Sequence, residues 1–536
     1  MVFESPAWAR ALPPVPLPDS ITVEEFMYSE KHGRKSLKLS RNPYTCGLTG
    51  QTYTVAEVRE RVDSMARAIA KRLDWSVANG TEWDKVACVF SWNTIDYVPL
   101  THALHRLNAI ASPANAAYSV SELTHQLRST SAKVLFTCVP LLPVALEAAA
   151  AAKISQDHIF ILDMPGQTNN SRFVALSALI EEGRRLRPLP PLKWAKEQGK
   201  RQVAYICFAS GTSGLPKGVM LSHHNIISNV ALQVAYETYG RKLAGVETQV
   251  GLGLLPFSHI YGLVIISHSM PWHGDEYKIR HLPLVPPIAI QLLQNKRKCD
   301  SYDLSSIEWV SSGAAPLGAK TIESMQQTWP KWKVGQGYGL TESSPAVCVT
   351  SEHDILNGTS GSIVLGARCK VIDDDGREVT ELEKPGELFV QSPNKCLGYM
   401  NNVKATAETF VWDEDGRWLR TGDVVVGNQL APVELEAHLL SHPFVADCAV
   451  IPVPDDFAGE VPKAFVVKDV STGDKSDEEV KIAICKYVES HKAKYKWLQG
   501  GVEFIETIPK SPSGKILRRV LQTREKEKSA EATPKL

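Results

Sequence analysis

Residues 208–218 read FASGTSGLPKG, and these residue types suit the binding of phosphate groups. Backbone N–H groups of a glycine-rich loop form an anion-binding nest, hydroxyls add donors, and a lysine supplies positive charge. The spacing is not that of the P-loop, in which Lys and Ser/Thr follow the second glycine directly. Here Pro216 precedes Lys217, and Gly211 and Gly214 lie three positions apart. Taken alone, the segment is either a phosphate loop of another kind or a solvated Gly/Ser turn.

Residues 312–316, SGAAP, offer a surface for a flat ligand. They follow the apolar run Ile307–Ser311, which has the composition of a strand. The small side chains of Gly313, Ala314 and Ala315 allow the backbone to approach a flat ring closely.

Residues 336–342, QGYGLTE, bring three functional groups together. Tyr338 offers an aromatic face for a base, Thr341 a hydroxyl for a phosphate, and Glu342 a carboxylate for Mg²⁺. Taken alone, Tyr338 is equally an ordinary buried aromatic residue.

Two charged residues nearer the C-terminus complete the set. Asp423 ends the segment Thr421-Gly422-Asp423 and can accept hydrogen bonds from ribose hydroxyls. Lys515 lies in the segment PKSPSGKILRR and is a point charge that a mobile domain can deliver to a reacting phosphate. Singly, Asp423 is also a turn residue and Lys515 a surface lysine, but the five stretches in this order favour one nucleotide site.

Alternating strands and helices must position these loops. Short β-rich apolar runs alternate with helical patterns before residue 400, which predicts an α/β fold with largely parallel sheets. The expected strands are Val86–Phe90, Val134–Cys138, His158–Leu162, Val203–Phe208, Gly253–Phe257, His281–Val285 and Ile307–Ser311. The expected helices include Val55–Leu73, Val120–Leu127 and Ala319–Gln327.

The chain changes character after residue 360. Residues 361–391 contain short alternating runs and an Asp-Asp-Gly turn, which predict a small antiparallel β-barrel. A second unit follows Asp423, with expected elements at Val433–Leu440, Ala446–Val453, Ala464–Lys468, Asp477–His491 and Val502–Ile505. We therefore expect a large N-terminal domain of α/β subdomains with a small β-barrel, residues 1–423, and a smaller α+β C-terminal lid domain, residues 424–536, that carries Lys515.

The composition is that of an ordinary globular protein. The chain has 536 residues, 43% of them apolar and 22% charged, and Lys+Arg and Asp+Glu are both 59. This balance gives no indication of a nucleic-acid partner. Ten cysteines without a C-x-x-C pair predict free thiols in a reducing compartment. The richest apolar run, Val134–Ala152, is interrupted by Pro140, Pro143 and Glu147, so it predicts a strand, a turn and an Ala-rich helix rather than a membrane span.

The end of the chain, Pro534-Lys535-Leu536, is similar to the peroxisomal tripeptide Ser-Lys-Leu. The charged tail Arg524–Pro534 is expected to be disordered, as suits an address read by a receptor. The expected location is peroxisomal or, if the ending arose by chance, cytoplasmic.

The five stretches and several others resemble the adenylate-forming superfamily of acyl-CoA synthetases, most closely its 4-coumarate:CoA ligase-like branch. The motifs that carry this resemblance are SGTSGLPKG (210–218), PFSHIYG (256–262), HLPLVPP (281–287), SSGAAPLG (311–318), QGYGLTE (336–342), PGEL (385–388), LRTGD (419–423), QLAPVELE (429–436), GEVPKAFV (459–466) and PKSPSGKILRR (509–519). They extend over most of the chain beyond residue 200, and the earlier region matches more loosely.

The resemblance implies a two-step reaction with ATP, Mg²⁺ and CoA. ATP and a small carboxylic acid give an acyl-adenylate and pyrophosphate, and the CoA thiol then displaces AMP. The residues implied for the β- and γ-phosphates are Ser210, Gly211, Thr212, Ser213 and Lys217. Those implied around the adenine are Gly313, Ala314, Ala315, Gln336, Gly337 and Tyr338.

The remaining roles follow from the same resemblance. It implies Thr341 for the α-phosphate, Glu342 for Mg²⁺ and Asp423 for the ribose, with Gln429 also contributing to the nucleotide site. Lys515 would stabilise the charge that develops during adenylation. The residues implied at the acyl pocket are His259 and Tyr261, and the implied catalytic set is His259, Thr341 and Lys515. His259 is alternatively a core histidine.

Two intervals are shorter than in the family. Only the seven residues Trp272–Lys278 separate the PFSHIYG helix from HLPLVPP, where the family has a strand and a helix. A parallel crossover needs roughly a dozen residues, so a unit of the sheet is expected to be missing. Only Val424–Asn428 separate Asp423 from Gln429, where the family has a hairpin, a hinge, a ribose-binding Arg and the loop that lines the pantetheine channel.

These short intervals leave several functions open. The adenylation elements remain, whereas the missing parts serve domain rotation and contact with CoA. The leading expectation is an acyl or aryl acid:CoA ligase. The alternatives are an enzyme that transfers the acyl group to a carrier-protein thiol or to oxygen, an enzyme that accumulates the adenylate, a nucleotide-binding pseudoenzyme and a purely structural α/β protein. Two exons skipped in the coding sequence would also account for both intervals.

Overall fold

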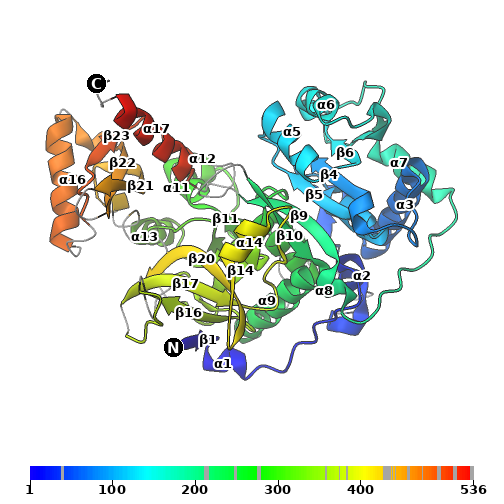
Figure 1. The fold of residues 1–536 in the computed structure, drawn as a ribbon, viewed down its shortest axis with the longest axis horizontal. Coiled ribbons are helices and arrows are strands. Elements are labelled where there is room, and N and C mark those ends of the chain that lie inside the picture. Colours follow the sequence, from blue (N-terminus) through cyan, green and yellow to red (C-terminus); the bar gives the residue numbers. More distant parts are fainter. Residues whose placement is uncertain are drawn as a thin grey trace.

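The computed structural model shown in Figure 1 describes most of the chain. It describes residues 1–531 except 35, 38–41, 210–215, 247–249, 274–278, 356–358, 374, 382–383, 427–435, 437–438, 441, 456–458, 474, 492–496 and 511–515. The C-terminal tripeptide 534–536 is therefore outside the described residues, and the peroxisomal location stays a prediction.

An eight-stranded sheet forms the centre of the N-terminal part. Its order is β18-β10-β9-β5-β4-β6-β7-β8, and the six strands from β9 to β8 run parallel, as predicted. The strands are β4 (Val86–Phe90), β5 (Ile110–Ala114), β6 (Val134–Thr137), β7 (Ile159–Ile161), β8 (Val174–Ala175), β9 (Val203–Ala209), β10 (Lys217–Ser222) and β18 (Gly398–Tyr399).

Helices cover both faces of this sheet because side chains alternate along its strands. Ala87 and Val89 of β4 share a core with α3, α4 and α7, whereas Cys88 and Phe90 share another core with α5 and α6. The helices of this part are α1 (Ala7–Arg10), α2 (Val23–Tyr28), α3 (Val55–Leu73), α4 (Tyr97–Arg106), α5 (Val120–Ser129), α6 (Leu142–Ala151), α7 (Leu176–Arg184), α8 (Gln198–Arg201) and α9 (His223–Leu243).

The start of α3 shows why the predicted bounds were accurate. Thr54 precedes the helix and Glu57 is its third residue, so each side chain binds the other's backbone N–H, at 3.2 and 2.8 Å. This capping box is readable from the sequence as Thr-x-x-Glu before an amphipathic run.

A second, five-stranded sheet follows in the order β11-β12-β13-β14-β15. Strands β11 to β13 are parallel, and β14 and β15 continue the sheet antiparallel. The strands are β11 (His281–Leu284), β12 (Trp309–Ser312), β13 (Lys333–Gly339), β14 (Ala346–Val349) and β15 (Ser362–Ile363). The associated helices are the π-helix η5 (Tyr261–Ser269), α10 (Met270–His273), α11 (Pro286–Gln294), α12 (Lys296–Cys299), α13 (Ala319–Thr328) and the 3₁₀ turn η6 (Thr341–Ser343).

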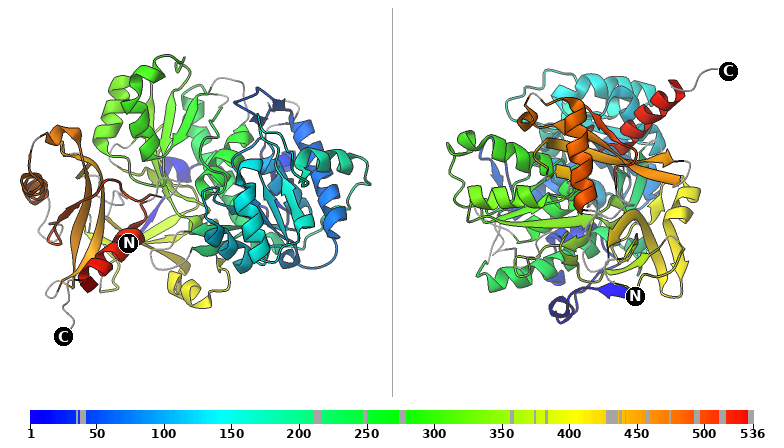
Figure 2. Two further views of the ribbon diagram at one scale, coloured as in Figure 1. Left: turned by 90° about the horizontal axis from the view of Figure 1, so that it is seen from above. Right: turned by 90° about the vertical axis from the view of Figure 1, so that its left-hand side faces the viewer.

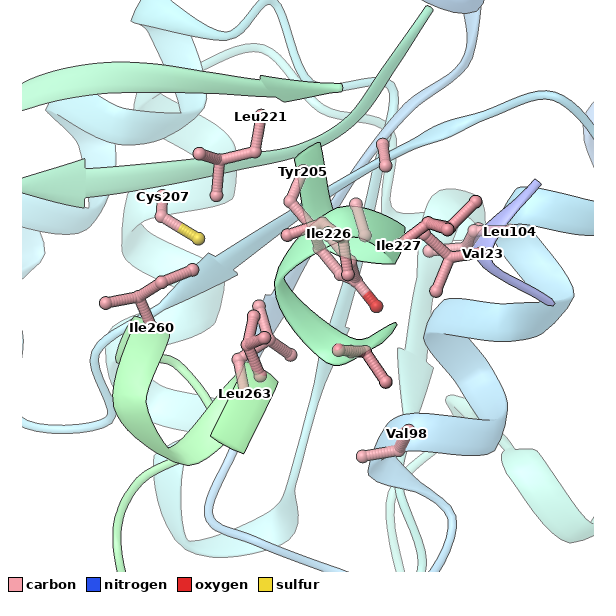
Figure 3. Close-up of a cluster of buried hydrophobic side chains, with 14 of the residues drawn as sticks. Val23, Val98, Leu104, Tyr205, Cys207, Leu221, Ile226, Ile227, Ile260 and Leu263 are labelled. Atoms are coloured by element: carbon pink, nitrogen blue, oxygen red, sulfur yellow. The ribbon is translucent and has the colours of Figure 1, made fainter. Parts of the chain in front are cut away.

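Hydrophobic packing fixes η5 against the first sheet. Ile260 and Leu263 belong to the same buried cluster as Tyr205 of β9, Leu221 of β10 and Ile226 of α9, and Figure 3 shows these side chains converging. The segment that carries His259 and Tyr261 is therefore anchored on the core of the large sheet.

One predicted strand is absent. Gly253–Phe257 forms no strand, and only Gly251 makes an isolated bridge, to His281. The Asn93 side chain satisfies this segment's backbone instead: its amide donates to the carbonyls of Gly253 and Leu255 at 3.1 and 2.9 Å. Side-chain bonds of this kind compete with a sheet ladder and are not visible in hydrophobic periodicity.

The region predicted as a small β-barrel is a five-stranded antiparallel sheet. Its order is β1-β16-β17-β20-β19, and no pairing joins β1 to β19 in the described part of the chain, so the sheet is open there. The strands are β1 (Val2–Glu4), β16 (Arg368–Ile372), β17 (Pro385–Gln391), β19 (Phe410–Asp413) and β20 (Gly416–Val426), and α14 (Val403–Thr409) lies beside them. A short hairpin pairs β2 (Tyr44–Thr45) with β3 (Thr52–Tyr53).

A smaller α+β unit ends the chain. It contains β21 (Val445–Asp455), β22 (Gly459–Lys468), β23 (Val502–Phe504), α16 (Asp477–His491) and α17 (Arg518–Glu531). Figures 1 and 2 place this unit at one end of the molecule, away from α3 and α7. The prediction that the tail is disordered was wrong for residues 524–531, which continue α17: Leu521 of this helix is buried with Ala449 and Phe465 of the sheet.

Two predictions about this unit remain open. Most of the helix expected at Val433–Leu440 lies outside the described residues, and the domain boundary after Asp423 falls inside β20, which runs to Val426. All ten cysteines are free, as predicted, and seven of them are buried.

Candidate functional site

The parallel pairing of β12 and β13 brings two predicted segments side by side. Ser312 pairs with Gln336, so Gly313 and Gly337 follow at neighbouring positions near the carboxyl ends of the strands. The Gln336 side chain accepts a 2.7 Å hydrogen bond from Leu317 N and holds the intervening loop against β13. Carboxyl ends of parallel strands are where ligands bind in α/β folds.

The backbone directly after β12 lies close to a neighbouring side chain and adopts an unusual conformation. A Cβ atom at Gly313 would lie 3.1 Å from Cε1 of Tyr261, which is tighter than ordinary contact. Ala314 adopts a φ of +67°, a left-handed conformation that costs energy for any residue with a side chain. Such strain persists only where the surroundings enforce it, and it clusters at functional sites.

These segments line one open cavity, whose empty space is about 860 Å³ when the solvent at its mouth is included. Other walls of the cavity come from α9, η5 and β11. The predicted site residues that line it are His259, Tyr261, Gly313, Ala314, Gln336, Gly337, Tyr338 and Thr341. Ala315 adjoins the cavity through Ala314 but does not line it, and Lys217, Glu342 and Asp423 are placed by separate contacts.

Asp423 joins this site through Tyr338. The Tyr338 hydroxyl donates a 2.7 Å hydrogen bond to Asp423 Oδ2. Burial, and then the neighbouring Asp423 carboxylate, raise the pKa of Tyr338 well above its ordinary value, so the phenol keeps its proton. The structure therefore places the aromatic ring predicted for adenine next to the carboxylate predicted for ribose.

Glu342 and Lys217 meet at a second aromatic residue, Tyr399. Met400 N donates to Gly218 O at 2.8 Å, so β18 brings Tyr399 alongside β10. The Tyr399 hydroxyl donates to Glu342 Oε1 at 2.7 Å, and Lys217 Nζ lies 5.1 Å from the centre of its ring. This tyrosine thus links the predicted metal ligand to the predicted phosphate-binding lysine.

The donor set around Glu342 fits Mg²⁺ bound together with a nucleotide. Glu342 is buried, with 9% of its surface exposed. The described residues contain no group of three or more His, Cys, Asp or Glu side chains that could hold a metal by themselves. Mg²⁺ typically binds through one or two carboxylates plus substrate phosphates, so a single buried carboxylate is a suitable ligand.

His259 and Tyr261 lie where η5 begins. Tyr261 N donates to His259 Nδ1 at 3.3 Å, and Tyr261 OH donates to the carbonyl of Ser311 at 3.3 Å. Burial raises the pKa of Tyr261 to about 12. His259 lines the large cavity and also a smaller one of about 370 Å³, next to Phe208 and Tyr118, so it stands at the junction of two cavities rather than in the core.

Several predicted residues lie outside the described residues, and their roles stay predictions. They are Ser210, Gly211, Thr212, Ser213, Gln429 and Lys515. The residues on either side of the glycine-rich loop are described: Ala209 pairs with Lys217 in an antiparallel hairpin.

The residues at the site that were not singled out from the sequence include Tyr399, Gln233, Glu237 and His281. Gln233 and Glu237 lie four residues apart on α9, so they share one face of that helix. Two polar residues at this helical spacing are a signal that the sequence does contain. Tyr399 and His281 depend on strand pairing between distant segments, which periodicity does not reveal.

Comparison with known families gives two matches along the chain. The family described as AMP-binding enzyme matches residues 39–400, and the one described as AMP-binding enzyme C-terminal domain matches residues 434–515. In the described residues, no helix is both long and apolar enough to cross a bilayer.

Two of the similar proteins are fungal acyl-CoA ligases. The chain is 34% identical to acyl-CoA ligase easD of Emericella nidulans, over 97% of this chain and 100% of that protein. It is 36% identical to acyl-CoA ligase AKT1 of Alternaria alternata, over 97% of both chains.

Solved structures share the fold at lower identity. The anthranilate CoA ligase AuaEII, in complex with anthranoyl-AMP, has a TM-score of 0.74 and 22% identity, over 96% of this chain and 99% of that one. ATP-bound MatB from Rhodopseudomonas palustris has a TM-score of 0.74 and 20% identity, over 95% and 99% of the two chains.

Proposed function

The chain belongs to the AMP-binding enzyme family, and we propose that it is an ATP-dependent acid:CoA ligase that works through an acyl-adenylate. The observation that carries this proposal is the single cavity that brings Tyr338 and Thr341 together with His259 and Tyr261. A nucleotide and an acid bound there would lie close enough to react. The branch of the family, resembling 4-coumarate:CoA ligases, stays a prediction.

In the first step a carboxylate oxygen of the acid attacks the α-phosphorus of ATP. A P–O bond forms to the acid, the bond between the α- and β-phosphates breaks, and pyrophosphate leaves. Tyr338 and the backbone at Gly313 hold the adenine. Asp423, next to Tyr338, accepts hydrogen bonds from the ribose hydroxyls. The Thr341 hydroxyl donates a hydrogen bond to an α-phosphate oxygen. Lys515 meets the charge that develops as the bond breaks.

In the second step the CoA sulfur attacks the acyl carbon of the adenylate. A C–S bond forms, the C–O bond to AMP breaks, and the thiol proton passes to solvent. His259 stands between the large cavity and the smaller one, so it is placed where an entering thiol would meet the acyl group.

Mg²⁺ would be held by Glu342 and would neutralise charge on the phosphates of ATP. The Tyr399 hydrogen bond orients Glu342 for this purpose. Lys217, over the face of the same tyrosine, adds positive charge for the outer phosphates.

We further propose that the acyl acceptor is CoA. The fungal relatives that the chain matches over nearly their whole length are acyl-CoA ligases, which supports CoA rather than a carrier-protein thiol. The aligned span with the Emericella nidulans protein is 575 residues, longer than this 536-residue chain. The alignment therefore contains gaps in this chain, and the short intervals at 272–278 and 424–428 stay predictions.

Pyrophosphate release tests the first step. The purified chain, ATP, Mg²⁺ and a panel of aromatic and fatty acids should release pyrophosphate only when a suitable acid is present. A folded sample that binds ATP by calorimetry, yet releases no pyrophosphate with any acid of a broad panel, would be a nucleotide-binding pseudoenzyme. Addition of CoA should speed release by freeing the enzyme from the adenylate.

A further inference from the structure

The segment η5, which begins at Tyr261, is a π-helix. It extends over nine residues, Tyr261–Ser269, and the N–H of Met270 donates to Ile265 O, five positions earlier. π-Helices are rare and occur mostly as single turns, frequently at functional sites. A π-helix of this length therefore needs interactions that stabilise it over the more common α-helix.

Three consecutive side chains at the end of η5 bind its own backbone. Ser267 Oγ donates to Leu263 O, and Ser269 Oγ donates to Val264 O at 3.2 Å. His268 Nδ1 lies 2.5 Å from Leu263 O and 3.0 Å from Ser267 Oγ. A carbonyl oxygen can only accept a hydrogen bond, so Nδ1 carries the proton of the ring and donates it to Leu263 O. Side chains thus tie the end of η5 to its first half.

The other ring nitrogen of His268 is bound in the core of the first sheet. Burial lowers the pKa of His268 to about 4, so the ring is neutral and its Nε2 is an acceptor. The donors within reach are His102 Nε2, on α4, at 3.2 Å, and the Tyr205 hydroxyl, on β9, at 3.3 Å. All three side chains are 0% exposed. His268 therefore connects the backbone of η5 to α4 and β9.

The register of η5 decides which side chains face the cavity. Ile260 and Leu263 pack in the core of the first sheet, whereas Tyr261 lines the cavity and His268 returns to the core. An α-helix turns by about 100° per residue, so conversion of a π-turn into an α-turn would rotate one end of η5 against the other by about that angle. Tyr261 and His268 would then not both keep their present contacts.

We propose that His268 is a positioning residue for the ligation reaction: it holds η5 in the π register from the core, and this register places His259 and Tyr261 in the cavity wall. The inference rests on the proposed function, which assigns those two residues to the acid. His268 lines neither the large nor the small cavity, so it acts only through η5. Tyr338 and Asp423 belong to β13 and β20, so its loss should affect the acid more than ATP.

Two substitutions separate the hydrogen bond from the volume of the side chain. His268→Leu removes the donor and keeps a similar volume, whereas His268→Asn keeps an N–H donor close to the position of Nδ1. We would measure kcat/KM for benzoate, cinnamate and decanoate by pyrophosphate release, and the Kd for ATP by calorimetry.

His268→Leu should lower kcat/KM for the acid about tenfold or more, because it leaves buried polar groups without their partner. The Kd for ATP should stay at the wild-type value, and His268→Asn should recover most of the lost kcat/KM. A loss of ATP affinity as large as the loss of kcat/KM, or no recovery in His268→Asn, would overturn the inference.

His105→Leu is the matched control. His105 is also fully buried in this core, but its Nε2 lies 3.2 Å from Ala204 O of β9 and makes no hydrogen bond to η5 among the described residues. Both Leu variants should lower the melting temperature, and only His268→Leu should lower kcat/KM for the acid. Equal losses of kcat/KM in the two variants would report general damage to the core and would overturn the inference.

A milder pair of variants serves if His268→Leu does not fold. Ser269 and Ser64 are each 2% exposed, and each donates a hydrogen bond within its own helix, Ser64 to Glu60 Oε1 of α3 at 3.0 Å. Ser269→Ala should lower kcat/KM for the acid, and Ser64→Ala should not. Equal values of kcat/KM in these two variants would contradict the proposal.

Hydrogen–deuterium exchange separates this inference from the ligase function, because it needs neither acid nor turnover. The amides of η5 should exchange faster in His268→Leu than in the wild type and in His105→Leu. Exchange in η5 that is no faster than in His105→Leu would overturn the inference. Absence of pyrophosphate release by the wild type would instead contradict the ligase function, and the exchange would still decide whether His268 holds η5.

Discussion

The Tyr338 hydroxyl donates a hydrogen bond of 2.7 Å to Asp423 Oδ2, across 85 positions of sequence. Tyr338 belongs to β13 of the second sheet and Asp423 to β20 of the antiparallel sheet. The bond therefore holds together two subdomains at the point where adenine and ribose are proposed to bind. It also orients the Asp423 carboxylate before ATP arrives.

Replacement of Tyr338 by Phe should weaken ATP binding while the aromatic face is kept. A hydrogen bond to a charged group contributes about 1.5–3 kcal/mol, so we expect the Kd for ATP to rise about tenfold or more. Calorimetric titration measures this directly. Tyr302→Phe, at a side chain that is 64% exposed, is the control and should bind ATP normally. An unchanged Kd for Tyr338→Phe would contradict the role given to this bond.

Replacement of Tyr399 by Phe should change the dependence on Mg²⁺. The ring that faces Lys217 remains, but Glu342 loses the donor at 2.7 Å. Loss of a partner of a metal ligand typically weakens metal binding about tenfold or more, so the Mg²⁺ concentration for half-maximal activity should rise by that factor. The rate at saturating Mg²⁺ should recover most of its value. A lower rate at every Mg²⁺ concentration, with the midpoint unmoved, would indicate a purely structural tyrosine.

Local sequence signals predicted the regular elements well. Val55–Leu73 and Asp477–His491 match α3 and α16, because caps and amphipathic periodicity are local properties. The prediction of a strand at Gly253–Phe257 was wrong. The Asn93 side chain donates hydrogen bonds to two carbonyls of this segment, and an apolar run in the sequence does not reveal such bonds. The prediction of a disordered tail was wrong for residues 524–531, because Leu521 of the same helix packs on the C-terminal sheet. The charge content of the tail does not indicate this contact.

The sequence predicted only part of the candidate site, because several of its residues depend on contacts between distant segments. Motif resemblance identified Gly313, Tyr338 and Thr341, and the cavity brings them together. Tyr399 and His281 enter the site through the pairing of β18 with β10 and of β11 with β12. Strand register between distant segments is a property of the assembled fold, so residues that depend on it are missed.

Lys515→Ala should abolish most adenylate formation and leave ATP binding nearly unchanged. This lysine is proposed to meet charge that develops in the transition state, not charge already present on bound ATP. The single-turnover rate of adenylation should fall on the order of a hundredfold or more. Lys528→Ala, in α17, is a matched control in the same unit. Near-normal pyrophosphate release by Lys515→Ala would show that the role is assigned to the wrong residue.

A cluster of buried histidines makes the fold sensitive to acid. His102 lies between Tyr28 and His268, with contacts of 2.9 and 3.2 Å, and the ring of His105 lies 4.7 Å from that of His223. Burial lowers the pKa of His105 to about 3 and that of His268 to about 4, and it also lowers the pKa values of His102 and His223 well below the ordinary value. These rings are neutral in the folded protein at neutral and mildly acid pH.

Stability should therefore fall as the pH drops below about 6.5. The unfolded chain takes up protons at its histidines near that pH, whereas the folded chain does not until about pH 4. Between these values the free energy of unfolding declines by about 1.4 kcal/mol per pH unit for each such histidine. The melting temperature at pH 5 should be clearly below that at pH 7, and His105→Gln should reduce the difference. Equal melting temperatures at both pH values would contradict this account.

The central claim is that this 536-residue chain joins a carboxylic acid to CoA through an adenylate. The most direct test is mass spectrometry of one incubation with ATP, Mg²⁺, CoA and the acid panel, which measures acyl-AMP and acyl-CoA together. We expect acyl-CoA to form only when both the acid and ATP are present, with AMP formed in equal amount. Acyl-AMP that accumulates on the enzyme without acyl-CoA, or the absence of both products, would contradict it.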